Sequence, residues 1–212
     1  MFGFSSEQIA KACLLAPVIL LAVTVHEFSH ALAAAYQGDP TPKQDGRLTL
    51  NPFRHLSLFG TLCFIATNFI GWAKPVRVNP LNFKNPAKSL ALLALAGPAS
   101  NILLSFLCFI LLWLNQNYTP FVELLPKSLS QPIYLMLFVG VILNVGMAFF
   151  NLLPFPPLDG FRVISYFLPL DWVIAAEKYQ LFFLIALIAL MYFGFFRILL
   201  GNLTDFILKS LM

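Results

Sequence analysis

The chain has 212 residues, of which 59% are hydrophobic and only 10% are charged, and its mean hydropathy is +0.83. Soluble domains carry about 25% charged residues, so this composition excludes an ordinary soluble protein and indicates an integral membrane protein. The net charge of +4 is small and the basic residues gather in two loops, which favours an anionic lipid bilayer as the partner and no nucleic acid. Because no polar stretch is long enough for a second core, we expect a single membrane-embedded domain over residues 1–212, with its core at 10–165.

The first apolar run covers residues 10–36 and is long enough for a tilted membrane span. Its second half contains an H-E-x-x-H pattern formed by His26, Glu27 and His30. On a helix the two histidines lie four residues apart on one face, so their imidazoles can hold one zinc ion, with Glu27 one step round the helix. Ionisable groups inside a span are costly and usually functional, although a buried polar cluster that bridges helices is the alternative.

The next part of the chain alternates between polar and apolar stretches. Residues 47–50 and 71–80 have the composition of extended segments and predict short β-strands in the 39–80 region. Residues 56–72 are apolar, but their length lies at the lower limit for a membrane span. Hydropathy alone predicts a full membrane span at 56–72, whereas the positions of the candidate metal ligands predict an embedded or re-entrant segment.

Three further apolar runs follow, at residues 90–114, 132–153 and 181–208, and we expect each to form one helix. Three prolines in four positions, 154–157, prevent the second of these helices from continuing. Unwound backbone at membrane depth is tolerated only where it is buried in protein or lines a cavity. The sequence therefore predicts an all-α polytopic membrane protein with about four full transmembrane helices and one embedded segment.

A third metal ligand is expected because catalytic zinc usually has three protein ligands and one open position. We favour Asp159, which follows the proline-broken turn and precedes Gly160. Capping of a helix that begins near Phe161 is the alternative role for this aspartate. His55 is the rival ligand, although a solvated or interfacial histidine is the ordinary state at its loop-to-membrane boundary.

One metal ion shared by these residues constrains the topology. His26 and His30 lie near the C-terminal end of their helix and Asp159 lies just past the C-terminal end of 132–153, so both helices must cross the membrane in the same direction. The run 90–114 supplies one return crossing, and residues 38–89 must therefore make no net crossing. Seven basic residues then fall on one side of the membrane with only two acidic ones, so that side should be cytoplasmic and the metal should face it. These basic residues are Lys43, Arg47, Arg54, Lys74, Arg77, Lys84 and Lys88.

Three stretches resemble the signatures of the site-2 protease family of intramembrane zinc metalloproteases: the H-E-x-x-H pattern, the G-P-x-x-N pattern at 97–101 that ends in Asn101, and the stretch 151–160 that begins with Asn151. Residues 46–52 and 71–76 also resemble the compact prokaryotic subgroup without a PDZ domain. The resemblance implies a protease of the cell membrane that cleaves transmembrane protein substrates. It implies one Zn²⁺ per chain bound by His26, His30 and Asp159, with Glu27 as the catalytic glutamate, and it places Asn101 and Asn151 near the site.

The chemistry of peptide hydrolysis agrees with these roles. Zinc activates water and polarises a carbonyl, and Glu27 is suited to take the proton of the water and pass it to the leaving amine. The amides of Asn101 and Asn151 suit either an oxyanion and substrate backbone or plain interhelical hydrogen bonds. A zinc transporter or an inactive zinc-binding scaffold is the alternative class, but the sequence has no internal repeat typical of transporters, and a scaffold has no need of Glu27.

Overall fold

The structure is a computed structural model that describes residues 6–67, 71–118, 120–194, 200–202, 204–206 and 208–209. Three of its helices are long and apolar enough to cross a membrane: α1 (Ser6–Tyr36), α4 (Pro86–Asn117) and α5 (Lys127–Asn151). Helices α7 (Leu170–Lys178) and α8 (Gln180–Tyr192) meet at a bend of 65° and add a fourth crossing if they form one broken span. The structure therefore agrees with the expected helical membrane architecture, and its described residues supply three to four apolar helices where about four full spans and one embedded segment were expected.

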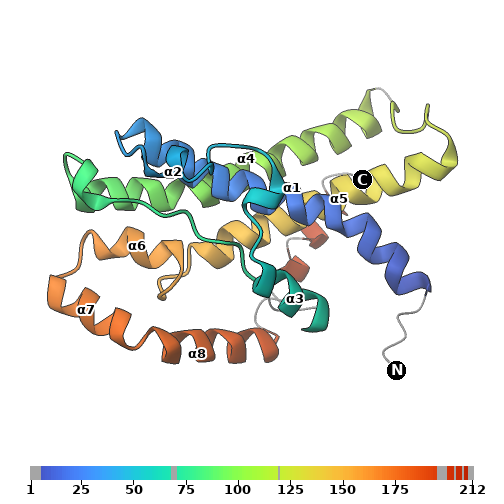
Figure 1. Cartoon of the computed structure of the whole chain (residues 1–212). Helices are drawn as coiled ribbons and strands as arrows, with labels where there is room; N and C mark the ends of the chain where they lie inside the picture. The colour runs from blue at the N-terminus through green and yellow to red at the C-terminus, as the bar shows by residue number, and fades with distance from the viewer. Residues whose placement is uncertain are drawn as a thin grey trace.

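Helix α4 packs against both α1 and α5, and α1 also contacts α5. Figure 1 shows that α1 and α5 run in the same direction and that α4 runs against them, as the shared metal ligands require. Small residues such as Ala22, Ala94 and Gly97 are buried where α1 meets α4, which lets the two backbones approach closely. Leu112 of α4 and Val141 of α5 form a core cluster farther along the bundle.

The segment between α1 and α4 leaves one end of the bundle and returns to the same end (Figure 1). It contains α2 (Thr41–Gln44), the 3₁₀ helix η1 (Pro52–Arg54), α3 (Leu58–Thr67) and the 3₁₀ helix η2 (Pro80–Asn82). With 10 residues, α3 is about 15 Å long, about half of the ~30 Å hydrocarbon core of a bilayer. Residues 68–70 of the expected embedded segment lie outside the described residues.

The predicted short strands are not found in the described part of this segment, where only Leu56 and Ala73 form an isolated antiparallel bridge. The reason is the buried side chain of Arg47, which turns inward from the stretch 47–50. Its guanidinium donates hydrogen bonds to the carbonyl of Arg54 and to those of Lys74 and Pro75, the last two at 2.7 and 2.9 Å. These carbonyls therefore bind a side chain and not a neighbouring strand.

Asp39 fixes the other end of the segment to α1. Its carboxylate is fully buried and accepts hydrogen bonds from the backbone and hydroxyl of Thr41, the backbone of Asn79 and the amide of Asn82. Burial raises the pKa of Asp39, but these hydrogen bonds outweigh it and hold the pKa below its ordinary value of 3.8. The end of α1 and the approach to α4 are thus joined by one charged side chain.

Two helix boundaries differ from the sequence-based expectation. Helix α5 begins at Lys127, five residues before Pro132, because a proline close to the start of a helix removes only one backbone hydrogen bond. The expected helix 181–208 is interrupted: α8 ends at Tyr192, and Gly194 adopts a left-handed conformation with φ +82°, in which its N–H donates to the carbonyl of Met191. A glycine in this conformation is a common helix stop.

Candidate metal centre

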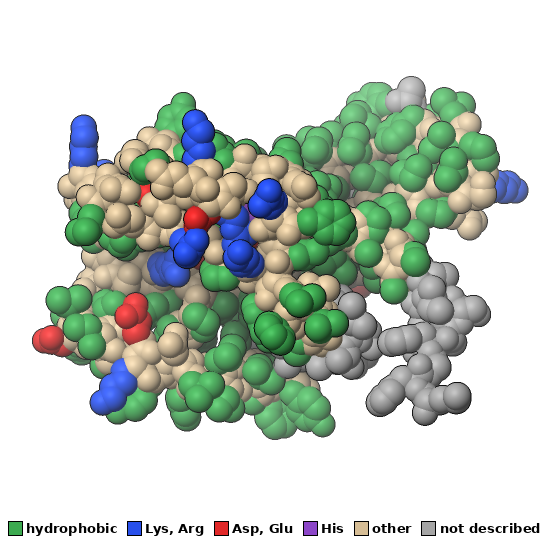
Figure 2. All heavy atoms as spheres, viewed as in Figure 1, with side chains coloured by type: hydrophobic (Ala, Val, Ile, Leu, Met, Phe, Trp, Pro, Cys, Tyr) green, Lys and Arg blue, Asp and Glu red, His purple; other side chains and the backbone are tan. Residues whose placement is uncertain are grey.

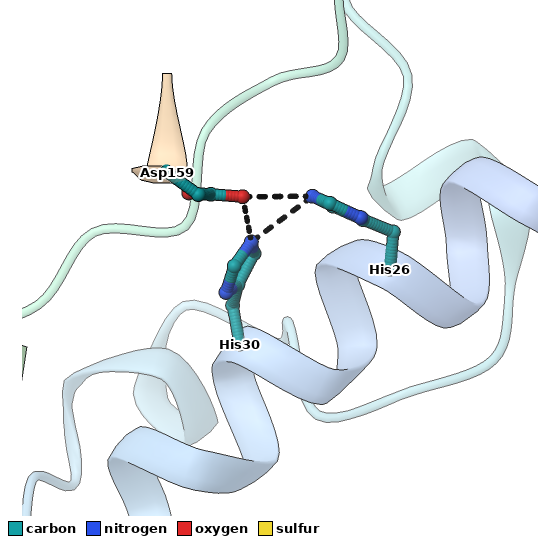
Figure 3. A group of neighbouring side chains, drawn as sticks. All are labelled: His26, His30 and Asp159. Atoms are coloured by element: carbon teal, nitrogen blue, oxygen red, sulfur yellow. Dashed lines mark hydrogen bonds and ion pairs between the residues drawn. The ribbon is translucent and has the colours of Figure 1, made fainter. Parts of the chain in front are cut away.

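Two histidines from α1 and one aspartate from the start of α6 (Asp159–Ser165) point toward a common centre, as Figure 3 shows. The His26 and His30 Nε2 atoms are 3.1 Å apart, and Asp159 Oδ2 lies 3.3 Å from the former and 3.2 Å from the latter. All three side chains are largely buried, with exposed fractions of 7%, 8% and 14%. The structure therefore brings the three predicted ligands together.

Hydrogen bonds behind the imidazoles decide which nitrogen of each ring carries the proton. His30 Nδ1 lies 2.8 Å from the carbonyl of Leu93, which can only accept, so this nitrogen must donate. His26 Nδ1 lies 2.6 Å from Asn101 Oδ1. The amide of Asn101 is oriented by Ala22, because its Nδ2 donates to that residue's carbonyl at 3.2 Å. In both neutral rings Nε2 is therefore unprotonated and has a lone pair available for a metal ion.

Three lone pairs thus face one another, because the buried Asp159 Oδ2 also has no hydrogen-bond donor among the described residues. Such an arrangement is repulsive unless a cation lies between the atoms. Four ligands placed tetrahedrally at zinc's usual distances of about 2.0–2.1 Å are about 3.3 Å apart, close to the spacings found here. The residues therefore fit a zinc ion with three protein ligands and an open position.

Gly97 of α4 lies directly against both histidines. A Cβ atom at this position would be 2.5 Å from His30 Nε2 and 2.7 Å from His26 Nε2. Any side chain would therefore push the two ligand nitrogens out of place. The glycine of the G-P-x-x-N pattern therefore has a second effect besides close helix packing, because its missing side chain leaves room for the two histidine rings.

Asp159 reaches the site because the chain turns back on itself after α5. Helix α5 ends at Asn151, turns follow, and α6 begins at Asp159. Gly160 permits the tight turn, since a Cβ there would lie 2.2 Å from the carbonyl oxygen of Leu152. The cap position of α6 is Leu158 and no side chain caps the helix, so the alternative capping role of Asp159 is not observed.

His55, the rival ligand, is not exposed to solvent and does not belong to the ligand group. Its side chain is fully buried, so it is not a solvated histidine, and its Nε2 faces the carbonyl of Thr49 at 2.7 Å. The group of potential metal ligands found among the described residues contains His26, His30 and Asp159 and omits His55. The backbone of Lys74 donates to the carbonyl of His55, so a segment farther along the chain lies beside this histidine.

Glu27 and the two asparagines occupy different surroundings. Glu27 is half-buried, lies within electrostatic range of both site histidines and Asp159, and makes no hydrogen bond to a described residue. The amide hydrogens of Asn101 are both used, by Ala22 and by Asn144. Asn101 therefore takes the interhelical role. Among the described residues, Asn151 donates one amide hydrogen to the carbonyl of Met147, which leaves its second amide hydrogen available.

Asn144 was not singled out from the sequence, although it belongs to this centre. It is 1% exposed in the middle of α5, and its Oδ1 accepts a hydrogen bond from Asn101 at 2.7 Å. The available signal was the same one that marked Asn101, a carboxamide inside an apolar run.

The described residues thus form a bundle of helices long and apolar enough to cross a membrane, with two histidines and an aspartate placed so that they could hold a metal ion. The chain is 42% identical over 151 residues to the Bacillus subtilis protein named "Putative zinc metalloprotease YwhC", a match that covers 71% of this chain and 67% of that protein. It is 30% identical over 174 residues to the Mycobacterium tuberculosis H37Rv protein "Putative zinc metalloprotease Rip2", covering 77% of this chain and 61% of the relative.

A shorter match, 37% identical over 82 residues, relates 39% of the chain to 36% of "Putative zinc metalloprotease MJ0611" of Methanocaldococcus jannaschii. No family model and no solved structure matches the chain. The chain thus spans from about a third to two thirds of the length of these relatives. It belongs to the family of these proteins, which are named putative zinc metalloproteases.

Proposed function

We propose that the chain is an intramembrane protease of the site-2 type, which hydrolyses peptide bonds in or near the transmembrane segments of membrane-protein substrates. The observation that carries the proposal is that two of the three ligands, His26 and His30, lie on α1, a helix with the length and hydropathy of a membrane span. His26 lies 20 residues after the start of α1 at Ser6, or about 30 Å along the helix axis. A substrate must therefore reach this centre from within the bilayer or from its edge.

The side chains divide the work of hydrolysis. His26, His30 and Asp159 hold one zinc ion, which supplies the Lewis acidity that activates water and polarises the scissile carbonyl. Glu27 takes a proton from the attacking water and delivers it to the nitrogen of the leaving amine as the carbon–nitrogen bond breaks. No hydrogen bond to a described residue competes for its carboxylate. The free amide hydrogen of Asn151 donates to the substrate carbonyl or to its backbone.

The proposed orientation places the metal toward the cytoplasmic side of the cell membrane, with the lipid bilayer as partner and no nucleic acid. It is supported by the parallel course of α1 and α5 and by the return of residues 38–85 to one end of the bundle (Figure 1). Figure 2 shows Lys and Arg side chains gathered on the face that carries this segment. Six of the seven basic residues in it and at the start of α4 are exposed, namely Lys43, Arg54, Lys74, Arg77, Lys84 and Lys88.

The test is cleavage of a labelled model transmembrane substrate by the purified full chain in detergent or proteoliposomes. We expect turnover that stops on zinc chelation and returns when zinc is added. Glu27→Gln should keep its zinc and lose cleavage by about 10²-fold or more, because an amide cannot accept the proton. Glu177→Gln, at an exposed position of α7, is the matched control and should retain full turnover.

Two results would contradict the proposal. Undiminished turnover by the Glu27→Gln variant would exclude the general-base role. A parent protein that binds zinc but cleaves no transmembrane substrate would favour an inactive zinc-binding scaffold, and zinc flux across proteoliposomes would favour a transporter.

A further inference from the structure

A chain of buried hydrogen bonds extends from His26 through two carboxamides into the middle of the bundle. His26 Nδ1 donates to Asn101 Oδ1 at 2.6 Å, Asn101 Nδ2 donates to Asn144 Oδ1 at 2.7 Å, and Asn144 Nδ2 donates to the carbonyl of Gly140 at 2.8 Å. Asn101 and Asn144 are 0% and 1% exposed, so water does not compete for these bonds. The chain joins α1, α4 and α5 on the side of His26 that faces away from the other ligands.

The direction of every bond in this chain is fixed from its far end. The carbonyl of Gly140 can only accept, so the NH₂ group of Asn144 faces it and Oδ1 faces Asn101. Asn101 must then present its NH₂ group to Asn144 and its oxygen to His26. His26 must in turn carry its proton on Nδ1, which leaves Nε2 unprotonated toward His30 and Asp159.

The two histidines differ in how this tautomer is secured. His30 relies on the backbone carbonyl of Leu93, which no substitution of a side chain removes. His26 relies on the side chain of Asn101, whose NH₂ group is held by two buried acceptors, the carbonyl of Ala22 on α1 at 3.2 Å and Oδ1 of Asn144 on α5 at 2.7 Å. Without Asn144, an amide hydrogen of Asn101 would be buried unpaired, and the amide would gain a reason to rotate toward another acceptor.

We propose that Asn144 is a positioning residue for the metal centre, which acts through Asn101 to hold His26 in its metal-binding tautomer. The proposal rests on the ligand role of His26 in the proposed function, but not on proteolysis. It makes zinc affinity depend on the position of α5, the same helix whose end leads to Asp159. Outer hydrogen-bond partners of metal-bound histidines commonly change metal affinity by about 10–100-fold, and we expect Asn144 to lie near the lower end of this range.

The test measures zinc affinity of the full chain in detergent by competition with a chromophoric chelator, together with the visible absorption spectrum of the Co²⁺-loaded protein. Asn144→Leu, similar in volume but unable to accept a hydrogen bond, should bind zinc about tenfold more weakly and alter the Co²⁺ bands. Asn144→Asp, which in its neutral form can both accept from Asn101 and donate to Gly140, should restore affinity and spectrum. If the leucine variant does not fold, Asn144→Thr replaces it. This variant should also bind zinc about tenfold more weakly and alter the Co²⁺ bands, because its hydroxyl reaches Gly140 but not Asn101.

Ser105→Ala is the matched control. Ser105 is 4% exposed and donates to the carbonyl of Val141 at 3.0 Å, so it also joins α4 to α5 through a buried hydrogen bond, but it has no link to His26. We expect this variant to bind zinc like the parent. Equal losses in the Ser105 and Asn144 variants, or none in either, would overturn the proposal.

The His26→Ala variant distinguishes a wrong ligand set from a wrong positioning role for Asn144. If this variant binds zinc as tightly as the parent, the ligand set of the proposed function is wrong. If it loses zinc while the Asn144→Leu variant keeps parental affinity and Co²⁺ bands, only the positioning role is wrong.

Discussion

Replacing Gly97 by alanine tests the geometry of the metal centre with a single methyl group. The added carbon would lie 2.5 Å from His30 Nε2 and 2.7 Å from His26 Nε2. Favourable contacts between such atoms begin at about 3.5 Å, so relief of the clash requires displacements of roughly 0.5 Å or more. Both rings are held from behind by hydrogen bonds of 2.6 and 2.8 Å, so neither can turn away freely.

A displacement of this size exceeds what a metal site tolerates, because ligand distances are held to within about 0.2 Å. We therefore expect the Gly97→Ala variant to fold and to bind zinc at least about 100-fold more weakly, a loss of about 2.7 kcal/mol. The assay is chelator competition in detergent, with helical content checked by circular dichroism. Gly201→Ala, where a methyl group would meet nothing within 4 Å, is the control. Zinc affinity in the Gly97 variant within threefold of the parent would refute the arrangement described here.

Three other predictions concern ligation, topology and acid stability. Asp159→Ala should lower zinc affinity by more than about 100-fold, the upper end for changes to residues that only hydrogen-bond a ligand. Asp171→Ala, at an exposed position, should leave zinc affinity unchanged. Undiminished zinc binding by the Asp159 variant would exclude Asp159 as a ligand. Single cysteines replacing Lys43 and Lys84 in a cysteine-free background should react with an impermeant reagent from the same side of the membrane, and opposite labelling would show a full crossing between them. Because the folded pKa of Asp39 is lowered, its stabilising effect should be complete above about pH 4 and be lost as pH falls through the folded pKa. In unfolding assays at different pH values, Asp39→Asn should therefore be destabilised relative to the parent at pH 6, and this difference should shrink as the pH falls below about 4. A difference that stays constant with pH would contradict this.

The parts of the site that follow from one helix or one turn could be predicted from the sequence. His26 and His30 share a face because helical spacing alone places them there, and their burial follows from the apolar run around them. Asp159 could be singled out because prolines force the chain out of α5 just before it. Asp159 can share one metal ion with the histidines of α1 only if α1 and α5 run in the same direction. The number of membrane crossings predicted from the sequence gives this direction, and the structure shows it.

The features that were missed depend on contacts between distant segments. Asn144 looks like any other polar residue in a span until α4 places Asn101 beside it. The strand expected near Arg47 rested on local alternation, whereas its side chain binds carbonyls 27 and 28 residues away in the sequence. His55 is fully buried, and the backbone at and beside it pairs with Ala73 and Lys74, a contact that its own neighbourhood in the sequence does not reveal.

The centre as a whole depends on two helices that share one spacing. On α4, Leu93, Gly97 and Asn101 follow one another at intervals of four residues and therefore lie in one stripe. On the antiparallel α1, His26 and His30 are also four residues apart, so Asn101 meets His26, Leu93 meets His30, and Gly97 lies against both rings. Each residue turns a helix by about 100°, so a change of one position in either spacing would carry a histidine or its acceptor out of the contact. The H-x-x-x-H spacing in α1 and the G-x-x-x-N spacing in α4 are therefore two halves of one constraint, set by the antiparallel packing of these helices.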